Sequence, residues 1–344
     1  MATISPDMGR TCCPQYTIRL DAQAFKPSKK QRQVINRMNR YLSGTKAGDK
    51  LPESELRAFE SGYGRDGGAH RLETRLIPAK ASRETFALYK KYQVAVHHDR
   101  PESVSMNGFR RFLCDSPLIP SDIPYESDAP GLPSSYGSYH LLYLVDSVLI
   151  GISVIDILPS CVSSVYFIWN PDWAWASLGK WSAMREVALA RDIQAAGATD
   201  MKWVYMGYWI ADCQKMRYKS EYSPSYLMDP ATFVFHPLTS ELDAFLQAHP
   251  HGYHPFEERP KSQPLLPALA SSEFPSPAPV GFAEPETISV DDLIILLSGR
   301  AVLVEDVPWV KPDEIKTALR ELVAAVGVNR MATPGRPGAV ISFS

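Results

Sequence analysis

Three apolar runs follow one another closely in the middle of the chain and limit what it can fold into. They span Tyr139–Val145, Val148–Ile157 and Val162–Trp169. Apolar runs of this length, bounded by turn residues, are typical of strands. Asp146 and Ser147 alone separate the first two runs, so we expect a tight hairpin there.

A helix and a fourth strand should follow these three. Residues 178–194 predict an amphipathic helix, and residues 202–210 predict a strand that ends in a polar loop. The side chains expected to face inward from the helix are Trp181, Met184, Ala188 and Leu189. Strands, then a helix, then a strand alongside is the order of the acetyltransferase-like (GNAT) α/β fold, an order that many α/β domains share. We therefore predict an α/β (α+β) fold of the GNAT type.

The residues before this block predict one strand and three helices. Thr11–Leu20 alternates enough for a short strand. Ser28 is a suitable N-cap for a basic helix that runs to about Leu42. Two further helices are expected over residues 82–96 and 107–115.

Composition excludes several classes of protein. No apolar run reaches the roughly 18 residues of a membrane span, so we expect no membrane partner. Five cysteines, of which two are close in sequence, do not make a disulfide framework, which favours a reducing, intracellular setting. We expect a monomer in the cytoplasm, with the nucleus as a second location.

One segment of the chain is strongly basic although the net charge is only −2. Between Lys26 and Arg40 there are six basic residues and no acidic one. Such a segment is either a solvated helix face or a contact for nucleic-acid phosphates.

Six strings, in order along the chain, resemble the arginyl-tRNA–protein transferases. They are CCPQYTIRL (Cys12–Leu20), FKPSKKQR (Phe25–Arg32), YQVAVHHD (Tyr92–Asp99), FRRFLCDSPL (Phe109–Leu118), DILPSCVSSVYF (Asp156–Phe167) and KMRYK (Lys215–Lys219). Any one of them could arise by chance, but six in the family's order could not. The resemblance covers roughly two thirds of the chain.

The resemblance implies an enzyme that takes arginine from arginyl-tRNA. The family joins this arginine to an N-terminal Asp or Glu, or to oxidised Cys, and so marks the protein for ubiquitin-dependent degradation. The expected partners are arginyl-tRNA and proteins with acidic N-termini. The alternative is a catalytically impaired relative that binds tRNA or acidic N-termini without turnover.

The sequence departs from the family's pattern in three places. The family has a Cys-x-x-Cys before the adjacent cysteine pair, and its four thiols bind zinc or an iron–sulfur cluster. Here only Cys12 and Cys13 are present, which predicts an incomplete metal site, because a structural zinc needs four ligands. Leu141 and Leu142 replace glutamines, and Ile210–Lys215 lacks a usual histidine and serine. The transfer itself requires no cofactor.

These features suggest five regions of the chain. We expect residues 1–45 to be the remnant of an N-terminal domain, most of which is absent, and 46–72 to be a flexible insertion. The transferase domain should span 73–250. Residues 251–287 overlap a stretch with eight prolines between Pro255 and Pro285 and predict a linker. Residues 288–344 form a C-terminal appendage, with a helix from Pro312 to about Val326.

Candidate site residues follow from the charges that the substrates carry. An acidic acceptor needs a cation, and the candidates are Lys215, Arg217 and Lys219, unless they merely face solvent. The arginyl side chain needs an anion, for which Asp156 is a candidate if it is not a strand-end cap. His140 could orient the acceptor or shuttle a proton, or it could be a core histidine.

The resemblance also suggests how tRNA binds. The candidates for phosphate contacts are Lys26, Lys29, Lys30 and Arg32. Four tryptophans could stack on the terminal adenine or could simply pack around the helix. They are Trp169, Trp173, Trp175 and Trp181.

An acyl-CoA-dependent acetyltransferase of the same fold is a rival interpretation. That class cradles pyrophosphate with an Arg/Gln-x-x-Gly-x-Gly/Ala turn at the start of the helix. Here Gly179 stands alone, with Ala176 and Trp181 at the other key positions. The turn therefore argues against acyl-CoA.

Overall fold

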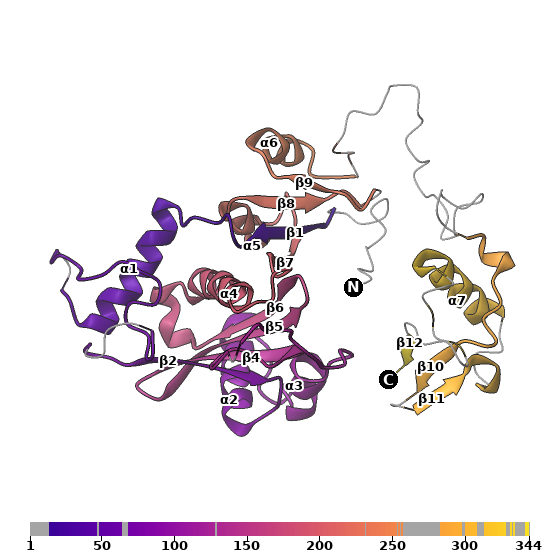
Figure 1. Cartoon of the computed structure of the whole chain (residues 1–344), viewed down its shortest axis with the longest axis horizontal. Helices are drawn as coiled ribbons and strands as arrows, with labels where there is room; N and C mark the ends of the chain where they lie inside the picture. The colour runs from indigo at the N-terminus through magenta and orange to yellow at the C-terminus, as the bar shows by residue number, and fades with distance from the viewer. Residues whose placement is uncertain are drawn as a thin grey trace. The chain divides into compact units, whose positions relative to one another are not determined.

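The computed structural model describes two compact units, shown in Figure 1. The described residues are 14–46, 48–63, 68–127, 129–230, 232–252, 254, 256, 283–297, 300–307, 313–327, 331, 333 and 341–343. Within them, one unit runs from Pro14 to Phe256 and the other from Ala283 to Phe343. No helix in these residues is both long and apolar enough to cross a membrane.

The larger unit is built on a nine-stranded mixed sheet of order β2-β4-β5-β6-β7-β1-β8-β9, with β3 paired to β4. Its strands are β1 (Tyr16–Asp21), β2 (Leu72–Pro78), β3 (Ser121–Asp122), β4 (Ser135–Val145), β5 (Val148–Leu158), β6 (Cys161–Trp169), β7 (Trp203–Trp209), β8 (Ser225–Met228) and β9 (Phe235–Pro237). Neighbouring strands are antiparallel throughout this path except β6 and β7, which are parallel. The mixed α/β architecture predicted from the sequence is confirmed.

The tight hairpin between β4 and β5 is also confirmed. Asp146 and Ser147 form its turn, and both have positive φ, 49° and 67°. Two left-handed residues make a turn whose twist matches that of the flanking strands. The two predicted strands pair from Gly137 opposite Ile157 to Val145 opposite Val148, with one register shift between Tyr143 and Leu144.

The larger unit has six α-helices among its described residues, and the first begins at the cap that the sequence predicts. They are α1 (Lys29–Ser43), α2 (Arg83–Tyr92), α3 (Met106–Leu113), α4 (Leu178–Ala195), α5 (Gln214–Arg217) and α6 (Ser240–Ala248). Ser28 and Gln31 form a capping box at the start of α1, and Gly44 ends that helix in the left-handed conformation. Ser82 caps α2 in the same way. Short 3-10 turns, η2 (Pro171–Ala176) and η3 (Tyr218–Glu221), precede α4 and follow α5.

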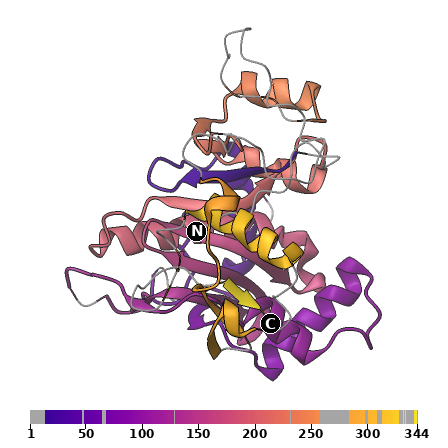
Figure 2. The same ribbon diagram turned by 90° about the vertical axis from the view of Figure 1, so that its right-hand side faces the viewer.

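The helices cover both faces of the sheet (Figures 1 and 2). Leu88 on α2 and Phe109 on α3 pack against Leu142, Ile152 and Ile168 on one face. Helix α4 connects β6 to β7 across the other face, and α1 packs on its outer side. This crossover is the connection that two parallel neighbouring strands require.

Helix α4 is buried on more sides than its sequence predicts. The prediction of a single inward face is wrong, because Ser182, Arg185 and Glu186 are buried together with Trp181 and Met184. The helix lies between the sheet and α1, so its outer side is covered as well. Two charged side chains consequently lie inside the protein.

The segment before β2 supplies the partner for one of these charges. In the region predicted to be a flexible insertion, Ala58, Phe59 and Glu60 are buried. The Glu60 carboxylate accepts hydrogen bonds from Arg185 on α4 and from Thr74 on β2. Whether the rest of this segment is flexible stays a prediction. Residues 58–60 are part of the core.

The C-terminal unit has its own small sheet and core. Its strands, β10 (Ile294–Leu297), β11 (Arg300–Leu303) and β12 (Ile341–Phe343), have the order β11-β10-β12. Helix α7 (Asp313–Val326) covers the sheet and contributes Leu319 and Val323 to the core beside Ile295. The predicted C-terminal helix is confirmed. The Pro-rich linker lies mostly outside the described residues, and the domain boundaries remain predictions.

We predict that Glu60→Ala destabilises the larger unit by about 3–5 kcal/mol, because it leaves Arg185 buried without its anion. Equilibrium urea unfolding would measure the loss. Glu55→Ala, which removes an exposed carboxylate from the same segment, is the control and should leave the unfolding midpoint within error. Equal effects of the two substitutions would contradict a structural role for the Glu60–Arg185 pair.

Candidate functional site

The strands β6 and β7 pair over a short distance and then separate. Their ladder consists of Cys161 with Trp203, Val162 with Val204 and Ser163 with Tyr205. Both strands continue for several residues beyond this point, to Trp169 and Trp209. The sheet is therefore open between them at one end.

A β-bulge lies in each strand where the two separate. The β5–β6 register shifts between Val154 and Ile155, which leaves Val165 on β6 without an opposing residue. The β1–β7 register shifts between Thr17 and Arg19, and Gly207 on β7 has φ 68°. Bulges bend the strand that carries them and increase its twist. They explain why β6 and β7 separate.

A cavity of about 580 Å³ occupies this opening. Strands β6 and β7, the start of α4, and the α5–η3 turn enclose it. Its lining residues are Tyr92, Ser164, Val165, Tyr166, Phe167, Trp169, Ala174, Ser177, Leu178, Gly179, Lys180, Met206, Lys215, Met216, Tyr218 and Lys219. Aromatic walls with three lysines and no acidic residue among the described lining suit a flat, partly anionic ligand.

The N-terminus of α4 forms one wall of this cavity. Ser177 precedes the helix in the left-handed conformation, φ 54° and ψ 47°, and its side chain makes no capping hydrogen bond. The backbone N–H groups of Leu178 and Gly179 are in the first turn, where an α-helix has no intrahelical acceptors for them. The N-terminus of this 18-residue helix thus adds partial positive charge to the cavity.

Lys219 brings a buried cation to the opposite wall. Its side chain is 9% exposed, and its Nζ donates to the carbonyl oxygen of Tyr208 at 2.6 Å. Burial lowers the pKa of Lys219 from 10.5 to about 8. Most molecules still carry the charge at neutral pH, so Lys219 can bind an anion here. Lys215 lines the same cavity.

The structure separates Arg217 from these two lysines. Its guanidinium donates to Gln247 Oε1 on α6 at 2.6 Å, and Arg217 is not among the residues that line the cavity. The KMRYK string begins as the helix α5, not as an extended chain, so its alternate residues point in different directions. Of the three predicted cations, two share the cavity.

His140 and Asp156 both lie away from this cavity. His140 is completely buried on β4, and its Nε2 is 2.8 Å from the carbonyl oxygen of Leu113. Burial lowers the pKa of His140, which favours the neutral ring. Asp156 on β5 accepts a hydrogen bond from Ser138, and burial raises its pKa. The environment of His140 matches the core histidine that the sequence left open.

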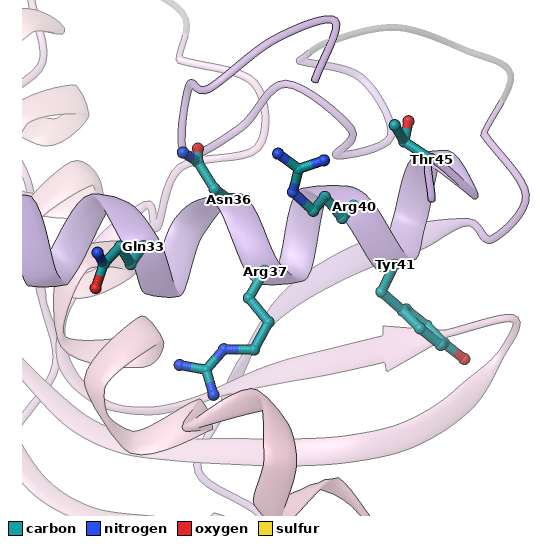
Figure 3. Close-up of a pocket in the computed structure, with 6 residues that line it drawn as sticks. All are labelled: Gln33, Asn36, Arg37, Arg40, Tyr41 and Thr45. Carbon is teal, nitrogen blue, oxygen red and sulfur yellow. The ribbon is translucent and has the colours of Figure 1, made fainter. Parts of the chain in front are cut away.

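A second, smaller depression lies along α1 (Figure 3). It has a volume of about 440 Å³ and is lined by Gln33, Asn36, Arg37, Arg40, Tyr41 and Thr45. Arg37 donates to the carbonyl oxygen of Trp175 at 2.6 Å. The predicted phosphate contacts Lys26, Lys29, Lys30 and Arg32 are all exposed at the start of the same helix.

The four tryptophans proposed for stacking have different environments. Trp181 is buried in the core, and Trp169 lines the cavity. Trp173 and Trp175 stack on each other at 5.4 Å beside Tyr41, and Trp175 is 40% exposed. Trp175 contacts Tyr41, which lines the depression on α1, and Ala174 of the same turn η2 lines the cavity.

The described residues hold no group of three or more His, Cys, Asp or Glu side chains that could bind a metal. Cys12 and Cys13, the predicted incomplete metal site, lie outside the described residues. The cysteines that the structure describes, Cys114, Cys161 and Cys213, are free. An incomplete site therefore stays a prediction.

Two family models match this chain. The C-terminal model of the arginine-tRNA-protein transferases covers residues 84–229, and the N-terminal model covers residues 3–33. Together they account for just over half of the sequence. The chain belongs to this family. The matched C-terminal region contains β6, α4 and β7 and every residue that lines the cavity.

Curated relatives agree with the family models. An arginyl-tRNA–protein transferase 1 from Drosophila melanogaster is 38% identical, covering 65% of this chain and 46% of the relative. The Arabidopsis thaliana protein of that name is 44% identical, covering 48% of this chain and 26% of the relative. The Saccharomyces cerevisiae protein is 34% identical, covering 63% and 44%. The match spans less than half the length of these family members.

Among solved structures, the C-terminal domain of a putative lysylphosphatidylglycerol synthetase from Agrobacterium fabrum is one match. It has 8% identity and a TM-score of 0.32, covering 68% of this chain and 64% of that chain. This likeness is too weak to support conclusions.

Glu186 is the site-related residue that the sequence did not reveal. It is 1% exposed on α4 and interacts with Ser164, which lines the cavity. Burial raises its pKa from 4.5 to about 7, although hydrogen bonds from Ser153 and Ser164 oppose the shift. The sequence gives no signal for it, because a charged residue in a predicted amphipathic helix is expected on the exposed face.

We predict that Glu186→Gln removes a loss of stability that the wild type shows between pH 5 and pH 8. Because the folded-state pKa lies above the ordinary value of 4.5, the folded protein binds this proton more tightly than the unfolded chain does. Stability is therefore full below pH 4.5 and falls as pH rises through 7. The shift corresponds to about 3 kcal/mol.

Urea unfolding of wild type and variant at pH 5 and pH 8 measures this effect. The exposed Glu102→Gln is the matched control and should not change the pH dependence. If the difference between wild type and Glu186→Gln is the same at both pH values, Glu186 titrates as an ordinary carboxyl.

Proposed function

We propose that this protein transfers arginine from arginyl-tRNA to the N-terminal α-amine of proteins that begin with Asp or Glu, or with oxidised Cys. The transfer would mark those proteins for ubiquitin-dependent degradation. Family membership supports the reaction class. The observation that carries the proposal is the cavity between β6 and β7, which combines a helix N-terminus, aromatic walls and a buried lysine.

We further propose that the fold is acetyltransferase-like. Two parallel strands that separate, with the helix between them in sequence starting at the gap, agree with that prediction. Such an arrangement brings the first turn of the helix to the place where an acyl group would bind. In this protein the acyl group would be an aminoacyl ester.

The chemistry needs positioning more than activation. An α-amine attacks an ester that tRNA already activates, so holding the two together supplies much of the rate. The amine has an ordinary pKa near 8, so a useful neutral fraction exists at physiological pH. The N–H groups of Leu178 and Gly179, which line the cavity, would donate to the oxyanion that develops on the carbonyl.

Lys219 and Lys215 would recognise the acidic side chain of the acceptor. A buried ammonium forms stronger hydrogen bonds with a carboxylate than a solvated one does. An aspartate/glutamate leucyltransferase from Campylobacter jejuni, 31% identical over 97 residues, bears the name of these two amino acids. This relative supports acidic acceptors for the present chain as well.

The exposed face of α1 and the turn η2 would hold the RNA. Lys26, Lys29, Lys30 and Arg32 offer charge to phosphates, and Arg37 with Arg40 extends the basic face along the helix. Trp173 and Trp175 provide an aromatic surface between this face and the cavity. Base stacking on aromatics combined with basic contacts is typical of proteins that bind single-stranded nucleic acid. We include in the proposal that the transfer needs no cofactor and takes place in the cytoplasm or nucleus.

We predict that the purified chain labels a peptide that begins with Asp when incubated with tRNA, arginyl-tRNA synthetase, ATP and radiolabelled arginine. A peptide that begins with Gly, otherwise identical, should remain unlabelled because it has no carboxylate for Lys219. Scintillation counting of the isolated peptide measures the transfer. RNA binding without any label on the Asp peptide would support the catalytically impaired alternative.

We predict that Lys219→Met lowers kcat/KM for the Asp peptide by roughly 10- to 100-fold, since a hydrogen bond to a charged group contributes about 1.5–3 kcal/mol. Initial rates at varied peptide concentration measure the effect. Lys80→Met, which removes an exposed lysine elsewhere, serves as the matched control. An unchanged kcat/KM in Lys219→Met would exclude Lys219 from acceptor binding.

We predict that replacing Lys26, Lys29, Lys30 and Arg32 together with alanine weakens tRNA binding and reduces its salt dependence. Removing one cation that neutralises a phosphate should lower the slope of log K against log salt by about 0.7–0.9. Filter binding at several salt concentrations measures the slope. Replacing Arg110 and Arg111 on α3, which packs on the other face of the sheet, is the control. Equal slopes in the quadruple variant and wild type would place the RNA elsewhere.

A further inference from the structure

The structure assigns a proton-transfer role to Glu186: it accepts the proton of the attacking amine through the hydroxyl of Ser164 and returns it to the leaving ribose oxygen. This inference rests on the aminoacyl transfer proposed above. It concerns the question of where the proton goes during that transfer.

The position of Glu186 supports this role. It is buried on α4, and the hydroxyls of Ser153 on β5 and Ser164 on β6 interact with its carboxylate. Ser164 is also one of the residues that line the cavity. Ser164 thus has the carboxylate on one side and the substrate space on the other. A hydroxyl can donate one proton while it accepts another, so it can relay between the two.

The surroundings of Glu186 do not offset the negative charge of its carboxylate. Among the described residues its Oε2 has no hydrogen-bond partner, although the atom is buried. The neighbouring Arg185 is already paired with Glu60. A buried carboxylate without an ion-pair partner is costly, and packing alone would be served better by an apolar side chain. A function that needs an ionisable group explains the residue better than packing does.

The electrostatic environment keeps this carboxyl close to half-ionised at neutral pH. Desolvation raises its pKa to about 7, close to the value that general acid–base transfer needs. The titratable groups that interact with it are Tyr143 on β4, Tyr218 in η3 and Tyr222 after it. Burial raises the pKa of Tyr218 to about 12, so that phenol stays neutral. Arg185 and Glu60 also interact with Tyr143, but the opposite charges of this ion pair offset each other.

The residues that line the cavity leave the proton no better acceptor. The described lining contains no histidine and no carboxylate, and its buried lysine, Lys219, is mostly protonated at neutral pH. His140 is buried on β4 and does not reach this space. Glu186, one hydroxyl away, is therefore the group through which a proton can leave.

The proton balance of the reaction closes with this relay. The amine nitrogen forms a bond to the ester carbonyl carbon, and Ser164 takes a proton from that nitrogen while passing its own to Glu186. The bond between the carbonyl carbon and the ribose oxygen then breaks. Glu186 returns the proton through Ser164 to that oxygen, so an amide and a free ribose hydroxyl result and Glu186 is ionised again.

The pH dependence of kcat/KM for the Asp peptide tests the relay. In the wild type the rate should rise with pH in two steps, one near pH 7 for Glu186 and one near the amine's pKa. Glu186→Gln, which keeps the shape of the side chain, should lower the rate at pH 7 by about 10²-fold and remove the step near pH 7. Glu186→Asp should restore that step in part.

Two serine variants separate a relay from a structural role. Ser164→Ala should lose the same step and a similar factor in rate. Ser153→Ala, which removes the other hydroxyl that bonds to Glu186 but does not line the cavity, should keep the step and stay within about threefold of wild type. Thermal unfolding of each variant shows whether it is folded. If Glu186→Gln does not fold, Ser164→Ala alone tests the relay.

The outcomes distinguish a failure of the proton relay from a failure of the proposed arginine transfer. If the wild type transfers arginine and Glu186→Gln keeps the rate and the same two steps, the relay is wrong and the proposed transfer stands. If Ser153→Ala and Ser164→Ala behave alike, Glu186 has only a structural role. If the folded wild type transfers no arginine, both proposals fall.

Discussion

The separation of β6 and β7 is the constraint on which the rest of the site depends. A strand within a sheet satisfies its backbone groups through its neighbours, so two strands can separate only where something else replaces the missing ladder. Here the ladder ends at Ser163 and Tyr205, and a bulge bends each strand at that point. The start of α4 and the α5–η3 turn close over the gap. In a continuous sheet, the backbone N–H and C=O groups at this opening would be hydrogen-bonded between the two strands.

Helix α4 connects this opening to the core. Its first turn lines the cavity, and its next two turns carry Glu186 toward the sheet and Arg185 toward the Glu60 side. The ion pair with Glu60 ties the helix to a segment that is distant in sequence and lies before β2. The ion pair therefore anchors the same helix whose first turn lines the cavity. Of the two buried charged residues in the middle of α4, Arg185 holds the helix in place and Glu186 takes part in the proposed proton transfer.

Strong local signals made most of this fold predictable. The Asp146–Ser147 turn, the Ser28 cap and the apolar runs of β4 to β6 act over a few residues, and each gave the right element. The family strings then pointed to Lys215 and Lys219, which do line the cavity. Arg217 does not line the cavity, because a single helical turn, α5, directs it toward Gln247. Glu60 and Glu186 could not be found from the sequence, since their burial depends on tertiary contacts between distant segments.

Desolvation shifts the pKa values of an acid and a base near the cavity toward each other. A low-dielectric environment penalises whichever form is charged, so it raises the pKa of Glu186 to about 7 and lowers that of Lys219 to about 8. Both groups can therefore gain or lose a proton near neutral pH, although their ordinary pKa values differ by several units. An incoming carboxylate would stabilise the charged form of Lys219, whereas a departing proton would neutralise Glu186. Binding an acidic acceptor and accepting its amine proton are thus compatible in one cavity, because each event reduces the amount of uncompensated buried charge.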